Sequence, residues 1–136
     1  MHIKQRDDLH FGKCNEVNVL STIKSVFSDD IKLCTDPYAT IDYSSNDYNI
    51  ELKSRRIKHD KYHTAMIGKN KIDYLLEQDK KGIILYKYLD GLYYVEINEE
   101  IVNQFVLAKG GRYDRGKREI SDIYYIPIKL LKRLVT

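Results

Sequence analysis

Apolar positions near the start of the chain recur with a helical period, and shorter alternating runs follow them. Between residues 16 and 27 the apolar side chains share one helical face, which predicts an amphipathic helix. Segments with strand character follow at residues 31–34, 38–43 and 48–53. The turn-forming run from Ser44 to Asp47 joins the last two segments, so the pattern predicts a β-hairpin there.

The second half of the chain also mixes helical and strand patterns. A helix is predicted over residues 70–80, with Gly82 as its stop signal, and strands at 83–88 and 92–97 flank the hairpin dipeptide Asp90-Gly91. A basic, glycine-rich loop is expected from residue 109 to residue 118. A short strand at 123–126 and a final helix led by Pro127 through residue 134 complete the pattern. This order predicts an α/β fold in which a mixed β-sheet is flanked by α-helices.

The composition is that of an ordinary globular protein. The chain has 136 residues, of which 43% are hydrophobic and 32% are charged. We expect one domain over residues 1–136, because two domains of half this length would each bury little core. No apolar run approaches the roughly 20 residues of a membrane-spanning helix, and the charged first residues differ from an export signal. An intracellular protein is therefore expected, with cytoplasm and nucleus left open.

The predicted hairpin brings two carboxylates together. If paired positions add up to 93, Asp42 lies opposite Glu51, and Lys53 points to the same polar face because side chains alternate along a strand. Opposed like charges destabilise a hairpin unless a cation lies between them, and carboxylate oxygens are ligands that Mg²⁺ accepts. The alternative is a hairpin whose polar face is simply in solvent. The opposite face is apolar and carries Ile41, Tyr43, Ile50 and Leu52.

The first helix offers a third carboxylate. Glu16 shares helical spacing with Leu20, Ile23 and Phe27, which places it on the buried stripe of the predicted helix. A buried carboxylate needs compensation, and the same metal ion or Lys53 could supply it. A carboxylate stabilised by the dipole at the start of the helix remains the alternative.

These residues carry a resemblance to a known superfamily. Glu16 on a first helix, Asp42 on a strand and Glu51-Leu52-Lys53 on the next strand resemble the motif of the PD-(D/E)XK nucleases, over residues 12–97. Asp36, which precedes the Pro37 of an Asp-Pro pair, is a second candidate for the motif aspartate, but it falls outside the hairpin register. The resemblance implies a restriction-endonuclease-like mixed sheet, Mg²⁺ or Mn²⁺, and hydrolysis of DNA phosphodiester bonds.

Chemistry suggests a role for each residue of this motif. Phosphodiester hydrolysis needs an activated water and neutralised phosphoryl charge, which metal ions held by carboxylates supply. Asp42 and Glu51 would bind the metal, and Glu16 would bind it directly or through water. Lys53 would orient the attacking water.

Basic residues cluster around the predicted site, although the net charge is only +3. Lysine and arginine contacts to phosphates supply most non-specific affinity for nucleic acid, so we expect DNA, duplex or branched, as the partner. Solvated surface charge, a nuclease-like module that binds DNA without cutting it, an RNA endonuclease and a homodimer all remain open. The expected nucleic-acid-binding residues are Arg55, Arg56, Lys58, Lys61, Lys69, Lys71, Arg112, Arg115, Lys117 and Arg118.

Overall fold

Two β-sheets form the framework of the protein. The computed structural model describes residues 19–36, 38–112 and 119–134, with only the backbone described for 110–112 and 119–121. One sheet has six strands in the order β1-β2-β3-β5-β6-β9, and the other has three in the order β4-β8-β7. β3 and β5 are parallel, whereas the other neighbouring strands are antiparallel. The larger sheet is therefore mixed, which confirms the predicted α/β, restriction-endonuclease-like architecture.

The bounds of the elements are as follows. The larger sheet contains β1 (Lys32–Leu33), β2 (Tyr43–Ser44), β3 (Tyr48–Ser54), β5 (Lys81–Tyr88), β6 (Gly91–Ile97) and β9 (Lys132–Arg133). The smaller sheet contains β4 (Thr64–Gly68), β7 (Val106–Arg112) and β8 (Glu119–Pro127). The described helices are residues 19–26, α2 (Lys69–Glu77), α3 (Glu99–Val102) and the 3-10 turn η1 (Ile128–Leu130). None of the helices in these ranges is long and apolar enough to cross a membrane.

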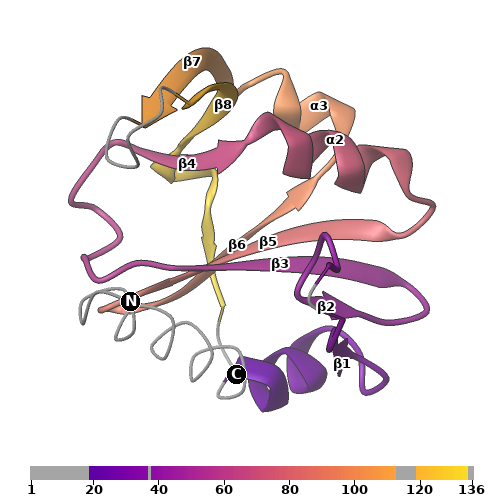
Figure 1. The fold of residues 1–136 in the computed structure, drawn as a ribbon. Coiled ribbons are helices and arrows are strands. Elements are labelled where there is room, and N and C mark those ends of the chain that lie inside the picture. Colours follow the sequence, from indigo (N-terminus) through magenta and orange to yellow (C-terminus); the bar gives the residue numbers. More distant parts are fainter. Residues whose placement is uncertain (1–18, 37, 113–118, 135–136) are drawn as a thin grey trace, which may run out of the picture.

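Each face of the larger sheet carries its own hydrophobic core. Helix 19–26 covers one face, where its buried residue Ile23 belongs to the same cluster as Ile50 of β3. α2 and the smaller sheet cover the other face, where Ile72 of α2 clusters with Ile84 of β5. Figure 1 shows these three layers, with α2, β4, β7 and β8 on one side of the sheet and the N-terminal helix on the other.

The predicted final helix is wrong. Pro127 ends β8, only the short turn η1 follows, and β9 then pairs with β6. Leu131 and Leu134 are both buried, and their spacing of three residues imitates a helical face. The backbone instead gains partners from the sheet, because Leu134 N donates to Leu92 O at 2.8 Å.

The smaller sheet was predicted only in part, because the strand expected at residues 123–126 lies within β8 whereas β4 and β7 were not expected. Thr64–Gly68 was assigned to no element, although Ala65 and Ile67 alternate with more exposed neighbours as in a strand. The glycine-rich sequence that was expected to form a loop belongs to β7 as far as Arg112, because its backbone pairs with β8. These strands form through pairing between distant segments, which local sequence patterns do not reveal.

The predicted hairpin register is confirmed, but its first strand is much shorter than expected. Tyr43 pairs with Ile50, and Ser44 with Asn49, so paired positions do add up to 93. The strand expected over residues 38–43 is reduced to Tyr43–Ser44. Ile41 therefore joins the core on the α2 side, and its predicted place on the face of Tyr43 is wrong.

Candidate active site between β3 and α2

Alternation along β3 sends polar side chains toward the α2 side of the sheet. Ile50 and Leu52 pack in the core under helix 19–26, so Asn49 and Glu51, which alternate with them along the strand, point to the opposite face. Asn49 is only 4% exposed and Glu51 only 5%. The alternative of a hairpin whose polar face is in solvent is therefore wrong.

Glu51 lies between two lysine ammonium groups. Lys53 Nζ is 3.5 Å from Glu51 Oε1, and Lys71 Nζ is 3.6 Å from Oε2. The second distance is that of an ion pair and exceeds the usual hydrogen-bond length. Within the described part of the chain, the buried Oε2 atom has no hydrogen-bond partner. One oxygen of a buried carboxylate thus retains its full capacity to accept a ligand.

The surroundings of Glu51 make its ionisation less favourable than that of a glutamate in water. Burial raises the pKa of Glu51 to about 7, and the negative charge of Asp42 adds to this increase. Lys53 and Lys71 oppose it only in part. A cation beside both carboxylates would reverse this effect, because positive charge stabilises the ionised form.

Backbone hydrogen bonds fix Asp42 next to β3. Its N–H donates to Ile50 O at 3.1 Å, and its carbonyl accepts from Cys34 N at 2.8 Å. Its carboxylate Oδ2 accepts from Leu52 N at 2.7 Å. In a longer β2, a backbone carbonyl would accept the hydrogen bond from Leu52 N. Here the Asp42 carboxylate accepts it instead. Asp42 is held rigidly, and the other lone pairs of its carboxylate remain for further ligands.

Lys71 has a place that the sequence did not reveal. It was predicted to contact phosphate, but its Nζ donates to the carbonyl of Thr40 and lies beside Glu51. Lys69, two residues earlier on α2, instead pairs with Asp73 at 2.5 Å near the surface. Sequence carried no signal for this difference, because it depends on how the connection from β3 through β4 places α2 over the sheet.

Several predicted residues fall outside the description of side chains. Glu16 lies outside the described residues, as do three basic residues of the glycine-rich segment: Arg115, Lys117 and Arg118. Arg112 is described by its backbone alone, as the last residue of β7.

The first basic cluster follows directly after β3. Arg56, Lys58 and Lys61 are exposed, whereas Arg55 is half-buried and its backbone N donates to Lys87 O at 2.8 Å. Lys61 Nζ lies 5.8 Å from the ring centre of Tyr62, which is 59% exposed. The segment therefore presents cations and an aromatic ring at the end of the strand that carries Lys53.

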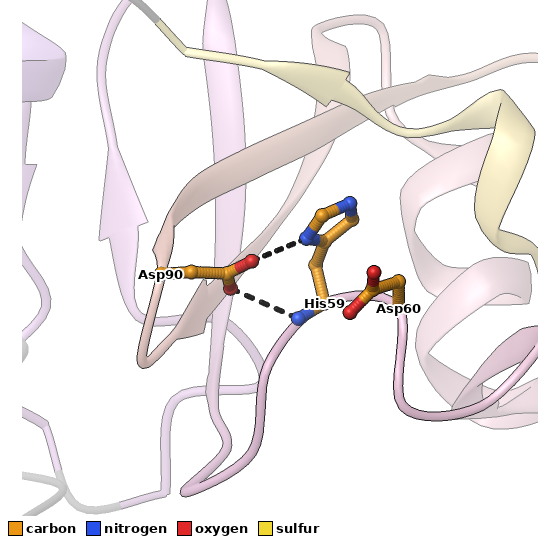
Figure 2. A group of neighbouring side chains, drawn as sticks. All are labelled: His59, Asp60 and Asp90. Carbon is orange, nitrogen blue, oxygen red and sulfur yellow. Dashed lines mark hydrogen bonds and ion pairs between the residues drawn. The ribbon is translucent and has the colours of Figure 1, made fainter.

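A second cluster of ionisable groups lies in the same loop. Figure 2 shows His59, Asp60 and Asp90, whose potential ligand atoms lie within 4.8 Å of one another. Asp90 accepts a 2.9 Å hydrogen bond from His59 N and contacts His59 Nδ1 at 2.5 Å. The hydrogen bond from the His59 ring lowers the pKa of Asp90, and this ring stacks on Tyr93 at 4.5 Å. The cluster connects this loop to the β5–β6 turn, and both carboxylate oxygens of Asp90 already contact His59.

Comparison with known proteins supports the family suggested by the motif. Residues 4–134 match the family described as "Phage putative PDDEXK endonuclease". Comparisons with curated proteins and with solved structures give no match. The family match covers nearly the whole chain, including the hairpin that carries Asp42 and Glu51-Leu52-Lys53. The chain therefore belongs to this phage family of PD-(D/E)XK endonucleases.

Proposed function

We propose that this protein is a divalent-metal-dependent endonuclease that hydrolyses phosphodiester bonds in DNA. The observation that carries the proposal is the buried Glu51 Oε2 atom, which lacks a hydrogen bond among the described residues. Its carboxyl group also interacts with the negative charge of Asp42. Leaving such an oxygen unsatisfied costs on the order of 1–3 kcal/mol, and more when it is charged. A cation at this position would remove that cost.

The donor set fits Mg²⁺, and Mn²⁺ is expected to substitute. Asp42 and Glu51 provide carboxylate oxygens, which these hard ions prefer, and Glu16 is proposed as a further ligand, directly or through water. When bound, the metal would neutralise phosphoryl charge and lower the pKa of a coordinated water. The rigid attachment of Asp42 to β3 favours a fixed ligand geometry.

Lys53 is proposed to orient the attacking water. It extends from the same face of β3 as Glu51, and its side chain is 31% exposed, so it can contact both the carboxylate and an incoming phosphate. An ammonium group in this position donates hydrogen bonds to water and to phosphate oxygens. Glu51 keeps it in place through their 3.5 Å contact.

DNA is proposed to bind across the basic residues that surround the site. The exposed cluster after β3 contacts backbone phosphates, and Lys69 extends the contact surface. Phosphate contacts stay predicted for four basic residues whose side chains lie outside the description: Arg112, Arg115, Lys117 and Arg118. Lys58→Ala should flatten the dependence of log affinity on log salt by about 0.9 for duplex DNA, because one phosphate contact is lost. The exposed Lys129, which lies in η1, provides the matched control Lys129→Ala. Equal slopes for wild type and Lys58→Ala would make this cluster ordinary solvated charge.

A cleavage assay tests the proposed activity. Supercoiled plasmid, a four-way junction and single-stranded RNA are each incubated with the protein in Mg²⁺, Mn²⁺ or EDTA. We expect DNA cleavage with either metal and none with EDTA. Cleavage of RNA alone would change the substrate class, and DNA binding without cleavage under any condition would indicate an inactive binding module. Glu96→Gln, on exposed β6 surface, is the control for carboxylate loss.

A further inference from the structure

The described members of the site form a balanced set of charges before any metal binds. Asp42 and Glu51 contribute two carboxylates, and Lys53 and Lys71 contribute two ammonium groups. Lys53 approaches Glu51 Oε1 and Lys71 approaches Oε2, so each oxygen has its own cation. Pairing lowers the cost of burying charge, so the two lysines offset in part the desolvation of a carboxyl group that is only 5% exposed.

The two lysines differ in how they are held. Lys53 belongs to the same strand as Glu51, whereas Lys71 comes from α2 and its ammonium group also donates to the Thr40 carbonyl. Lys71 therefore connects three separate parts of the chain at one point: the segment before Asp42, β3 and α2. Its side chain is 24% exposed, so its ammonium group has access to solvent if it leaves Glu51.

We propose that Lys71 is a positioning residue and built-in counter-ion, whose ammonium group occupies the place at Glu51 Oε2 that a divalent metal ion takes when it binds. This inference rests on the proposed metal-dependent function. It replaces the predicted phosphate contact of Lys71 with a role inside the site. Metal binding and the ion pair between Lys71 and Glu51 are then competing events.

The competition follows from the geometry. Oε2 is the oxygen without a hydrogen bond in the described part of the chain, so it is the free ligand position, yet an ammonium group lies 3.6 Å away. A divalent ion bound to this oxygen would be repelled by an ammonium group that contacts the same oxygen. Lys71 must therefore move away from Oε2, or the ion binds weakly. Lys71 thus positions the Glu51 carboxylate in the metal-free protein and lowers the affinity of that carboxylate for a metal ion.

The test measures metal binding in the absence of DNA. Mn²⁺ binding is followed by electron paramagnetic resonance at pH 8.5, where competition from protons at Glu51 is small. Lys71→Met should bind Mn²⁺ about tenfold more tightly than wild type, because the repelling charge is removed. Lys71→Arg keeps the charge and should restore affinity close to that of wild type. Lys129→Met, which removes an exposed ammonium group in η1, is the control and should leave the affinity unchanged.

A second measurement uses the wild-type protein, in case Lys71→Met does not fold. The ammonium resonance of Lys71 is assigned by its absence from the spectrum of Lys71→Arg. It should shift during a Mg²⁺ titration with the same midpoint as metal binding, whereas the Lys69 resonance should not shift. An unmoved Lys71 resonance while Mg²⁺ binds would overturn the inference.

The outcomes separate the two proposals. If wild type binds Mn²⁺, Glu51→Gln abolishes binding and Lys71→Met binds no more tightly than wild type, the role of Lys71 is wrong and the proposed function stands. If wild type binds no Mn²⁺ at millimolar concentrations, both proposals fail. Tighter binding by Lys71→Met, reversed by Lys71→Arg, supports the inference.

Discussion

Two clusters of ionisable side chains lie close together along the chain but differ in what they can bind. Glu51 in β3 is buried, and within the described residues one of its oxygens has no hydrogen bond. Asp90, beside His59, is partly exposed and accepts hydrogen bonds from both the ring and the backbone of that histidine (Figure 2). The second cluster also contains residue types that bind metals, but its Asp90 already accepts hydrogen bonds from His59. The unsatisfied buried oxygen of Glu51 is therefore the stronger of the two structural arguments for a ligand site.

Cleavage should distinguish the clusters most strongly. Glu51→Gln is expected to lower the rate of DNA cleavage at least about a thousandfold, because a metal ligand and its charge are lost. Asp90→Asn, which keeps an oxygen acceptor for His59, should remain within about threefold of wild type. The rates are measured on plasmid DNA with saturating Mg²⁺. A large loss in Asp90→Asn with full activity in Glu51→Gln would reverse the assignment.

The pH dependence of stability should differ in sign between the two carboxylates. The pKa of Glu51 is raised from 4.5 to about 7, so its contribution is fully present below about pH 4.5 and is lost as pH rises through about 7. The metal-free protein should lose at most about 3 kcal/mol of unfolding free energy across this window. The pKa of Asp90 is lowered, so its contribution is instead lost as the solution becomes more acidic.

Urea denaturation in EDTA measures this effect, as the difference between wild type and Glu51→Gln at each pH. The difference should favour wild type at pH 4.5 relative to pH 8. A difference that does not change with pH would mean that Glu51 ionises as easily in the folded protein as in the unfolded chain.

Metal should stabilise the fold through the first cluster only. A ligand that binds only the native state stabilises it by about 2.7 kcal/mol at a hundredfold excess over its dissociation constant. Mg²⁺ should therefore raise the melting temperature of wild type and of Asp90→Asn but not that of Glu51→Gln. Equal stabilisation of Glu51→Gln would locate the metal elsewhere, and its loss in Asp90→Asn would point to the His59 cluster.

The smallest effect is expected from the His59 cluster itself. His59→Phe keeps a ring that can stack on Tyr93 but removes the hydrogen bond to Asp90. Its melting temperature should fall by only about 1–4 °C, because partly exposed hydrogen bonds contribute little to stability. Its response to Mg²⁺ should match that of wild type. A lost metal response in this variant would show that the cluster is more than a connection between two loops.

Sequence predicted the parts of the site that depend on local order. The turn residues and the alternation around them fixed the pairing of Tyr43 with Ile50, and so placed Glu51 and Lys53 on one face. The contact of Lys71 with Glu51 could not be predicted, because it depends on the path of the chain through β4 and α2. The C-terminal strand was mistaken for a helix for a similar reason, since its hydrogen bonds come from β6. Contacts between strands that follow each other along the chain could be predicted. Contacts between segments far apart in the chain could not.

The hydrogen bond from Leu52 N to Asp42 Oδ2 has a consequence for how this family can change over time. Asp42 has two separate roles. Its side chain accepts a backbone hydrogen bond from β3, and it is proposed to hold a metal ion. A descendant that gave up catalysis would still need an acceptor there, and asparagine is the conservative replacement that supplies one. Lys53 instead contacts the side chain of Glu51, so its replacement would leave the backbone pairing of β3 intact. Degenerate relatives should therefore lose the lysine before the aspartate position loses its oxygen.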